Sequence, residues 1–437
     1  MSEKIKVALA GLGSRGKDTY ARAAEAYPDK MEITAIADIN PRKVQMVADR
    51  YRIPKAHCYS SAEEMLEEPR LADVMFITTQ DRQHVEQAIA ALRKGYHLLL
   101  EKPISPDLGE CGEIVRVAKE CGRKVVVCHV LRYTPVYRKA KEILDSGVLG
   151  DIVNINASEN VGWYHMAHSF VRGNWRNSEE SSPMILQKCC HDMDLYLWLA
   201  DKKCKSLSSF GSTYLFKKEN APEGCTARCL DGCGVKESCP YDAEAIYLDS
   251  DRIGARKGKA GWPLNVLTEV PTPESVEKAL RTGPYGRCVY HCDNNVVDHQ
   301  VINMNMTDGS TMSFSMCGFT ADFARHAQFC GTKGEMKVTM GSLDVEDDLI
   351  EVSLYGTKIK TEVFRAVDLA ADFSGHGGGD LVMVEEFLDI LLGNREESPS
   401  ITSLEVSVES HYCALAAEQS RLQGGAVIDL DTVRGET

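Results

Sequence analysis

The stretch Ile5-Lys6-Val7-Ala8-Leu9-Ala10-Gly11-Leu12-Gly13-Ser14-Arg15-Gly16 decides the fold. Its first half reads as a short buried strand, and its second half is a G-x-G-x-x-G turn. The first glycine of such a turn permits a tight bend, the second lets the backbone approach a pyrophosphate, and the third lets the next helix pack on the strand. Amides at the start of that helix attract phosphate charge. We therefore predict a dinucleotide site at Gly11, Gly13, Ser14, Arg15 and Gly16.

A second expected strand, residues 33–37, ends at Asp38, which lies about 20 residues or slightly more beyond the glycine turn. A carboxylate at this position accepts a hydrogen bond from a ribose 2′-hydroxyl and repels a 2′-phosphate. The sequence therefore favours NAD over NADP. Arg42 follows closely enough to weaken that preference.

Strand-like and helix-like segments continue to alternate along the first third of the chain. Sheets with this alternation are parallel, because each helix carries the chain back to the start of the next strand. We predict a Rossmann domain over residues 1–127. Its further strands are expected at residues 72–78, 98–100 and 124–127, and its helices at 17–27, 85–94 and 109–119.

Glu101-Lys102-Pro103 directly follows the apolar run 96–100, where a buried parallel strand would end. Open α/β sheets bind ligands outside the carboxyl ends of their strands, so a lysine at this position faces the ligand crevice. Its ammonium group is well placed to hold a hydroxyl. Taken alone, the tripeptide reads equally as a solvated turn, and only the surrounding strands favour the first interpretation.

These motifs, together with Ala37-Asp38, Thr79 with His84, and Arg132-Tyr133 with Pro135, resemble the Gfo/Idh/MocA oxidoreductase family. The resemblance implies a second α/β domain with an open, mainly antiparallel sheet, here residues 128–437. It implies a sugar-like substrate between that sheet and the nicotinamide, and a homo-oligomer, either a dimer or a tetramer. Contacts to the cofactor are implied for Thr79, His84, Glu101 and Lys102, and contacts to the substrate for Lys102, Arg132, Tyr133 and Gln187. Tyr164 follows the first expected strand of this domain, so its ring is a candidate to stack on a sugar or to pack in the interior.

Family members usually carry an Asp and, four residues later, a His on one helix face. Here the corresponding residues are Gln187 and His191, which would point together because residues four apart share a helix face. A glutamine cannot accept a proton, so the identity of the base stays open. Lys188 and Tyr133 are further catalytic candidates beside Lys102 and His191, and Tyr164 is another. Asp194 reads equally as a surface charge.

Ser374-Gly375-His376-Gly377-Gly378-Gly379-Asp380 precedes an amphipathic helix. Four glycines cost conformational entropy, which is usually recovered where the backbone approaches or moves around a ligand. The stretch resembles the loop of the NAD-dependent N-acetylgalactosaminidases, a glycosidase branch of the same superfamily. That resemblance makes His376 a candidate general acid/base, and an ordinary histidine pKa suits the task at neutral pH. The alternative is a linker in which His376 is incidental.

The resemblance implies an enzyme that uses NAD to oxidise a sugar hydroxyl, at carbon 3, of a glycoside. It further implies cleavage of the glycosidic bond by oxidation, elimination, hydration and re-reduction. Two alternatives stay open: a sugar, glycoside or inositol dehydrogenase without cleavage, and a regulatory protein that binds a dinucleotide without turnover. The substitution at Gln187 favours the last, whereas Lys102, His191 and the His376 loop argue against it.

Composition sets outer bounds. The 437 residues suffice for two or three domains, and 50 basic against 64 acidic residues give a net charge of −14. Such a balance does not favour nucleic acid or an anionic membrane as a partner. The first strand begins so early that no signal peptide is expected, and no apolar run approaches membrane-spanning length. We expect a cytoplasmic protein, whose 16 cysteines are then thiols or metal ligands rather than disulfides.

Several cysteines lie in a segment, about residues 216–295, that is too long for an unstructured loop. We interpret it as a Cys-rich insertion in the second domain, in a region too polar to build its own core. Four thiolates satisfy tetrahedral zinc, and a structural zinc would order the segment. An iron–sulfur cluster or unligated thiols are the alternatives. The preferred zinc ligands are Cys229, Cys233, Cys239 and Cys288, with Cys225 and Cys292 in reserve.

Overall fold

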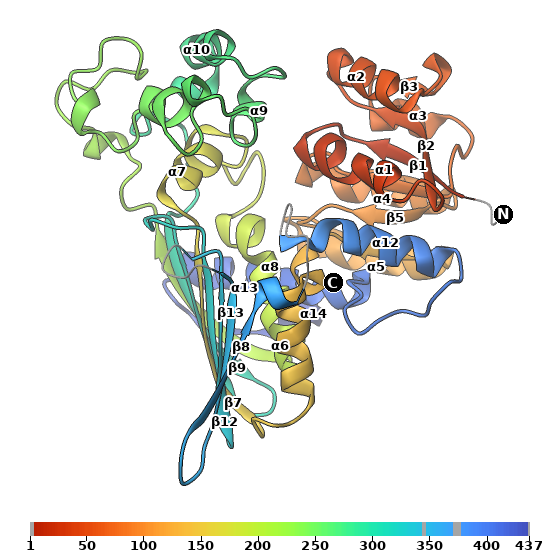
Figure 1. The fold of residues 1–437 in the computed structure, drawn as a ribbon, viewed down its shortest axis with the longest axis vertical. Helices are drawn as coiled ribbons and strands as arrows, with labels where there is room; N and C mark the ends of the chain where they lie inside the picture. Colours follow the sequence, from red (N-terminus) through yellow and green to blue (C-terminus); the bar gives the residue numbers. More distant parts are fainter. Residues whose placement is uncertain (1–3, 343–346, 370–376, 436–437) are drawn as a thin grey trace.

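The computed structural model describes residues 4–342, 347–369 and 377–435. Two sheets organise this part of the chain (Figure 1). The first has the strand order β3-β2-β1-β4-β5-β6, and all its pairings are parallel. This is the predicted Rossmann sheet. Its strands are β1 (Ile5–Ala10), β2 (Met31–Ala37), β3 (Cys58–Tyr59), β4 (Val74–Ile77), β5 (His97–Leu100) and β6 (Val125–Val127).

Helices cover both faces of the parallel sheet, as a nearly continuous run of buried Val, Ile and Leu requires. The glycine turn leads into the short helical segments η1 (Ser14–Thr19) and η2 (Tyr20–Arg22). The longer helices end where left-handed residues allow it, at Arg52 after α2 and at Gly122 after α5. The helices are α1 (Ala23–Ala26), α2 (Pro41–Tyr51), α3 (Ala62–Glu67), α4 (His84–Arg93) and α5 (Leu108–Cys121).

The second sheet has nine strands in the order β14-β13-β12-β11-β7-β10-β9-β8-β15. Only β7 and β10 pair in parallel, so the sheet is mainly antiparallel, as predicted. Its strands are β7 (Ile152–Asn160), β8 (Cys204–Ser212), β9 (His299–Met306), β10 (Thr311–Cys317), β11 (Arg325–Gly331), β12 (Gly334–Met340), β13 (Leu349–Leu354), β14 (Lys360–Arg365) and β15 (Ile428–Asp429).

One face of this sheet is packed and the other faces outward. Along β9 and β10 buried and exposed residues alternate, as in a strand with one covered face. The elements on the covered side include the long buried helix α8. The remaining helices of this part are α6 (Pro135–Asp145), α7 (Trp163–His165), α8 (Met184–Ala200), α13 (Leu404–Leu422) and α14 (Leu430–Gly435), with short turns η5 (Val130–Tyr133) and η6 (Met166–Arg172).

Helix α12 (Gly379–Leu391) comes late in the chain but packs on the first domain. Its Met383, Val384, Phe387 and Leu388 belong to the same buried cluster as residues of β1, β2 and β4. Figure 1 shows this blue helix on the Rossmann side of the molecule, where it packs against α1. Residues 128–437 therefore do not all serve the second sheet, since α12 completes the core of the Rossmann domain.

The Cys-rich insertion lies between β8 and β9 and contains α9 (Leu264–Leu267) and α10 (Pro273–Thr282). It has a small apolar core that includes Ile246, Tyr247, Leu264 and Leu280, so the expectation of a region without its own core was wrong. Its side chains pack around Tyr164 of α7, which follows β7. In Figure 1 the insertion lies at the top, next to the second domain and facing the Rossmann helices.

Candidate active site

The three glycines of the first turn occupy three different environments. A Cβ on Gly11 would lie 2.5 Å from the Thr78 carbonyl oxygen, and one on Gly16 would lie 2.0 Å from the Gly11 carbonyl oxygen. A Cβ on Gly13 would meet nothing within 4 Å. Gly11 also has a φ of +87°, which favours glycine. Only the second glycine opens outward, at the place where the motif brings a pyrophosphate against the backbone, so the turn fits a dinucleotide.

Asp38 stands at the carboxyl end of β2, beside the turn. Its Oδ2 accepts a hydrogen bond from the Leu12 amide at 2.6 Å, and its Oδ1 accepts one from the Asn40 amide at 2.7 Å. The carboxylate is thus fixed against the glycine turn, and its oxygens keep further lone pairs for a ribose diol. This geometry fits the role predicted for Asp38.

Arg15 and Glu101 form an ion pair that ties the glycine turn to the end of β5. The Arg15 Nε donates to Glu101 Oε1 at 2.7 Å, and its Nη2 donates to Asp380 Oδ1 at 2.6 Å. Tyr20 and the Lys102 amide also donate to the Glu101 carboxylate. Burial alone raises the pKa of Glu101, but the charges of Arg15 and Lys102 outweigh it and hold the pKa below its ordinary value. Glu101 is therefore a buried anchor for Arg15 and Lys102.

His84 is buried, and its ring lies between two strand-end loops. Its Nδ1 is 2.8 Å from the Pro103 carbonyl oxygen and its Nε2 is 3.2 Å from the Thr79 carbonyl oxygen. Thr79 in turn donates its hydroxyl to Gln87. The two residues hold the loops after β4 and β5 together, which is a positioning function for the cofactor side of the site.

Lys102 reaches from the end of β5 to the start of α8. Its Nζ donates to the Gln187 carbonyl oxygen at 2.9 Å, and its peptide bond to Pro103 is cis. The ammonium group thus lies where the Rossmann domain meets the second domain. This is the junction at which a substrate is expected in such two-domain proteins.

Gln187 and His191 lie one turn apart on α8, as their spacing predicts. Gln187 Oε1 is buried and accepts no hydrogen bond from any residue that the structure describes. A buried acceptor without a donor costs free energy and often marks the position of a missing ligand group. Gln187 therefore offers one buried side-chain acceptor, and its backbone carbonyl contacts Lys102.

A row of buried polar side chains lies behind His191. The rings of His129 and His191 are in edge contact, with centroids 5.7 Å apart, and His129 Nδ1 is 3.0 Å from Asp194 Oδ1. Arg132 grips the same carboxylate through two hydrogen bonds, of 2.6 and 2.5 Å. Burial alone raises the pKa of Asp194, but Arg132 and then His129 outweigh it and hold the pKa at about 2. Asp194 is thus an internal anion, and its interpretation as a surface charge was wrong.

Arg132 was predicted to contact substrate. In the structure its Nε and Nη2 both donate to the Asp194 carboxylate. Tyr133 was predicted to contact substrate and to act in catalysis. Its hydroxyl hydrogen-bonds Thr402 in the interior at 3.2 Å, and burial raises its pKa, so it is better described as a packing residue.

Lys188 and Tyr164 also have partners of their own. The Lys188 ammonium pairs with Glu159 at 3.0 Å, and Glu159 also pairs with Arg325. Tyr164 is buried against Phe323, with ring centroids 4.8 Å apart, and against Trp262 of the insertion. The Tyr164 ring therefore packs in the interior and does not offer an open face on which a sugar ring could stack. His376 lies outside the described residues.

Family profiles match the first domain and the first part of the second domain. The profile described as "Oxidoreductase family, NAD-binding Rossmann fold" matches residues 5–129, and the GFO/IDH/MocA C-terminal domain matches residues 137–229. The chain belongs to the Gfo/Idh/MocA oxidoreductase family. The first domain is accordingly an NAD-binding Rossmann fold.

Curated relatives of this family are distant in sequence. The chain is 23% identical over 404 residues to the putative oxidoreductase YteT of Bacillus subtilis, a match that covers 89% of this chain and 88% of that protein. It is 25% identical over 217 residues to inositol 2-dehydrogenase/D-chiro-inositol 3-dehydrogenase of Lactiplantibacillus plantarum, covering 49% of this chain and 58% of that one. The second match thus spans little more than half of the relative.

Solved structures share the whole fold. An oxidoreductase from Agrobacterium radiobacter, in complex with NAD+, L-tartaric acid and magnesium, superposes with a TM-score of 0.66 at 15% identity over 98% of this chain and 99% of that one. The transcriptional regulator Gal80p from Kluyveromyces lactis superposes with a TM-score of 0.69 at 14% identity over 99% and 93%. At such identities these likenesses show the fold alone.

The sequence analysis did not predict His129 or His411 as part of the site, nor the contact of Asp380 with Arg15. His411 lies in α13, and its ring stacks on that of His129 with centroids 5.8 Å apart. Its Nε2 accepts the Ile104 amide at 2.7 Å, and burial lowers its pKa to about 3. The available signal was weak, because a single histidine in an apolar helix indicates neither burial nor a partner about 280 residues away.

None of the helices in the described ranges combines the length and the apolar character needed to span a membrane.

Proposed function

We propose that this protein is an NAD-dependent dehydrogenase that oxidises a secondary hydroxyl of a sugar or cyclitol ring. The observation that carries the proposal is the junction of Lys102 with α8, where a lysine, a buried acceptor without a donor and a histidine meet within one helical turn. The inositol dehydrogenase relatives support a polyhydroxylated ring as the substrate class.

The cofactor is held by the first domain. The pyrophosphate lies against the outward-facing backbone at Gly13, and the Asp38 carboxylate accepts hydrogen bonds from the ribose hydroxyls. When bound, NAD accepts hydride from the carbon that bears the reacting hydroxyl. Arg15, Glu101 and His84 hold the strand-end loops in place around this position.

Lys102 and His191 divide the work on the reacting hydroxyl. The Lys102 ammonium donates a hydrogen bond to the hydroxyl oxygen and stabilises the negative charge that develops there. In this proposal His191 takes the proton as general base. Behind it lie the His129 ring and the Asp194 carboxylate. Lys188 is committed to Glu159 and Tyr133 to Thr402, so neither is needed as the base.

Gln187 binds a second hydroxyl of the substrate. Its Oε1 can only accept, so it suits the hydroxyl of a neighbouring ring carbon, which can donate. A carboxylate at this position would compete for the proton, whereas an amide does not. In this chain, therefore, recognition falls to Gln187 and proton transfer to His191.

The finer proposal is a glycoside oxidised at carbon 3, with cleavage of the glycosidic bond following oxidation. It rests on the resemblance of residues 374–380 to the loop of the NAD-dependent glycosidases. Its proposed acid, His376, would protonate the departing oxygen. Release of the aglycone without accumulation of reduced cofactor, lost in His376→Ala, supports cleavage. Reduced cofactor formed in proportion to intact oxidised glycoside supports a dehydrogenase instead.

Lys102→Met tests the proposal. We expect turnover of a panel of inositols, free sugars and nitrophenyl glycosides to fall by at least about 100-fold, because the charge on the alkoxide loses its partner. Affinity for NAD, measured by calorimetry beside NADP, should change little. The matched control is Lys119→Met, an exposed lysine of α5, which should retain full activity.

The competing function is a regulator that binds the dinucleotide without turnover. The glutamine at position 187 favours it, and the Gal80p likeness shows that the fold serves regulators as well. A protein that binds NAD tightly but leaves every substrate of the panel unchanged, in the wild type as in Lys102→Met, contradicts the dehydrogenase and supports the regulator.

We also propose a homo-oligomer formed through the open face of the nine-stranded sheet. Phe210 on β8 and Val301 on β9 are directly paired on that face, and their exposed fractions are 55% and 42%. Adjacent exposed apolar side chains on a sheet are suited to a second copy of the chain. Sedimentation of the wild type against Phe210→Ser measures this contact.

A further inference from the structure

Two segments of the insertion, far apart in sequence, form a short antiparallel ladder. Arg228 lies opposite Arg287, the Cys229 amide donates to the Gly286 carbonyl at 3.0 Å, and the Cys288 amide donates to the Ala227 carbonyl at 2.9 Å. Side chains alternate between the two faces of a strand, and directly opposite residues share a face. Cys288, opposite Ala227, therefore shares its face with Cys225 and Cys229.

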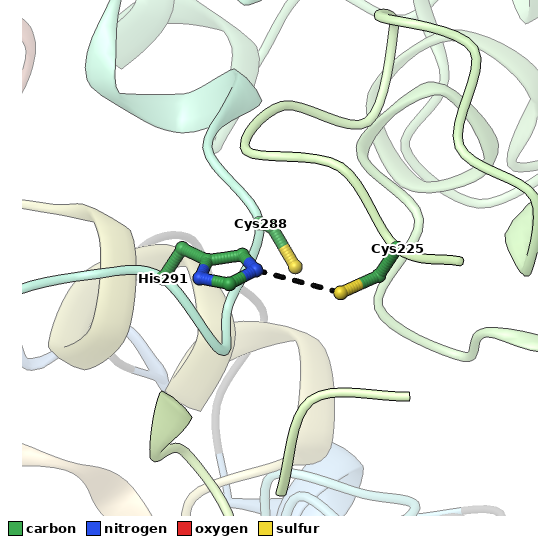
Figure 2. A group of neighbouring side chains, drawn as sticks. All are labelled: Cys225, Cys288 and His291. Atoms are coloured by element: carbon green, nitrogen blue, oxygen red, sulfur yellow. Dashed lines mark hydrogen bonds between the residues drawn. The ribbon is translucent and has the colours of Figure 1, made fainter. Parts of the chain in front are cut away.

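A histidine joins these thiols through a tight turn. The His291 amide donates to the Cys288 carbonyl at 3.0 Å, and His291 Nε2 lies 3.4 Å from the Cys225 sulfur. The ligand atoms of Cys225, Cys288 and His291 all lie within 4.8 Å of one another. Figure 2 shows the three side chains converging from two separate segments of the chain.

The space between the segments is about the size of one ion. A cavity of about 10 Å³ is lined by the sulfur-bearing residues Cys225, Cys229, Cys233, Cys239 and Cys288. A void of this volume holds about one water-sized sphere. Of the four ligands predicted from the sequence, only Cys288 belongs to the compact group with Cys225 and His291, and the other three line the same cavity.

Arg172, on η6, supplies an independent observation. Its side chain is fully buried, and it lines the same cavity. Its Nε donates to the Arg287 carbonyl, its Nη2 to the Tyr241 carbonyl and, at 3.6 Å, to the Cys229 sulfur. Among the residues that the structure describes, its Nη1 has no hydrogen-bond partner and forms no ion pair; Asp242, which lines the same cavity, accepts the Ala245 amide instead.

A buried guanidinium without a counter-charge is costly, because removing an ion from water costs several kcal/mol unless another charge offsets it. Neutral thiols do not provide that charge. Thiolates bound to a metal do, since three thiolates and one neutral imidazole around a divalent ion carry a net charge of −1.

We propose that Cys225, Cys229, Cys288 and His291 bind one structural Zn²⁺ and that Arg172 is the counter-ion of this centre. Three thiolates and one imidazole are a common structural zinc set. Cys229 completes the set because it shares the ladder face and its sulfur already faces the guanidinium. The ion joins the two ends of the insertion, and Arg172 links it to the second domain.

Metal analysis of the purified chain tests the site. We expect about one zinc per chain in the wild type, released when thiols are alkylated, as a four-ligand thiolate site requires. Cys225→Ser, Cys288→Ser and His291→Ala should each lose zinc. Cys58→Ser is the matched control, because Cys58 is a partly buried thiol of the first domain whose bond to the Pro54 carbonyl a serine can keep.

Three outcomes overturn the proposal. Wild-type protein that contains no zinc and binds none after reduction excludes the centre. Iron with acid-labile sulfide makes it an iron–sulfur cluster. Zinc that is kept in Cys225→Ser but lost in Cys233→Ser or Cys239→Ser overturns the ligand assignment. The alkylation experiment uses wild-type protein. It therefore tests the thiolate site even if one of the variants fails to fold.

Arg172 is tested as a positioning residue by its effect on metal affinity. Arg172→Met should weaken zinc binding by roughly 10- to 100-fold, the usual cost of removing an outer-shell partner. Arg172→Lys keeps the positive charge and should recover most of that loss. Equal zinc affinities in the wild type and Arg172→Met, measured by chelator competition, exclude the counter-ion role.

Discussion

Asp194 and Arg132 place opposite charges in the interior, directly behind the candidate base. Both residues are buried, and the carboxylate receives two hydrogen bonds from one guanidinium. Such a pair contributes little more to the free energy of folding than an apolar pair would. Removing one partner, however, leaves the other charge buried and uncompensated. The pair therefore makes the site sensitive to single substitutions.

Asp194→Asn should lower the free energy of unfolding by about 3–5 kcal/mol, because the Arg132 charge loses its partner. Urea unfolding at neutral pH measures the loss. The control is Glu120→Gln, in an exposed pair with Arg116, where the change should stay below about 1 kcal/mol. Equal effects of the two substitutions contradict the assignment of a buried pair.

The same pair predicts a pH dependence. The pKa of Asp194 in the folded chain is about 2, below its reference value of 3.8. A lowered carboxyl pKa means that the unfolded chain binds the proton more readily. The contribution of the pair is therefore complete above pH 4 or so, and it is lost as the pH falls through about 2. The difference in stability between wild type and Asp194→Asn should shrink over that interval.

At the level of single residues, the sequence was informative where a motif fixes both residue type and position. Asp38 and Lys102 follow buried strands, so their place at the ligand edge of the sheet could be predicted. Asp194, His129 and His411 could not be placed, because their burial depends on contacts between β6, α8 and α13. No local pattern records such contacts.

The glycine turn shows how one element combines two kinds of glycine. Gly11 and Gly16 face backbone atoms at distances that no Cβ can tolerate, whereas Gly13 faces open space. The first two therefore serve folding, and the third serves the ligand.

Substitutions in the turn should separate these roles. Gly13→Ala should leave the thermal midpoint nearly unchanged and weaken NAD binding by at least 10-fold, because the methyl group enters the space meant for the pyrophosphate. Gly16→Ala should destabilise the domain itself, since its Cβ would lie 2.0 Å from the Gly11 carbonyl oxygen. Calorimetry with NAD and thermal unfolding without it measure the two effects. Tight NAD binding by a folded Gly13→Ala protein would contradict the assigned pyrophosphate site.

At the level of elements, the alternation of strand-like and helix-like segments predicted the parallel sheet, whereas the antiparallel sheet was expected only from the family resemblance. The sequence pattern could not predict the partner of α12, since an amphipathic helix shows that it has a buried face but not which sheet covers it. The insertion was misjudged for a related reason. Its core is assembled from short turns and side chains such as Tyr247 and Leu280, which leave no periodic signal.

In the whole molecule, the insertion connects both domains. Asn265 Nδ2 lies 3.4 Å from Asp18 Oδ2, and Asn40 Nδ2 lies 3.5 Å from Glu269 Oε1. These contacts join α9 and its neighbours to η1, which follows the glycine turn, and to the loop that follows Asp38. Figure 1 shows α9 directed toward the Rossmann helices. We expect the order of the insertion, and hence the proposed zinc, to influence how tightly NAD is held.

Removal of the metal should therefore weaken NAD binding without abolishing it. The two contacts are long and polar, so a loss of only a few-fold is expected. Calorimetry before and after zinc release measures it, and Glu269→Ala with Asn265→Ala, which removes both contacts directly, is the matched comparison. An unchanged NAD affinity in both proteins contradicts this link between insertion and cofactor.

The placement of α12 has a consequence for folding of the chain during its synthesis on the ribosome. Synthesis proceeds from β1 onward, yet the core of the first domain also needs Phe387 and Leu388, which are among the last third of residues to be made. Until they emerge, the apolar surface that they cover is exposed to solvent and to other chains. A nascent chain halted after α5 should therefore be sensitive to protease, and this protein should depend on chaperones for most of its translation time.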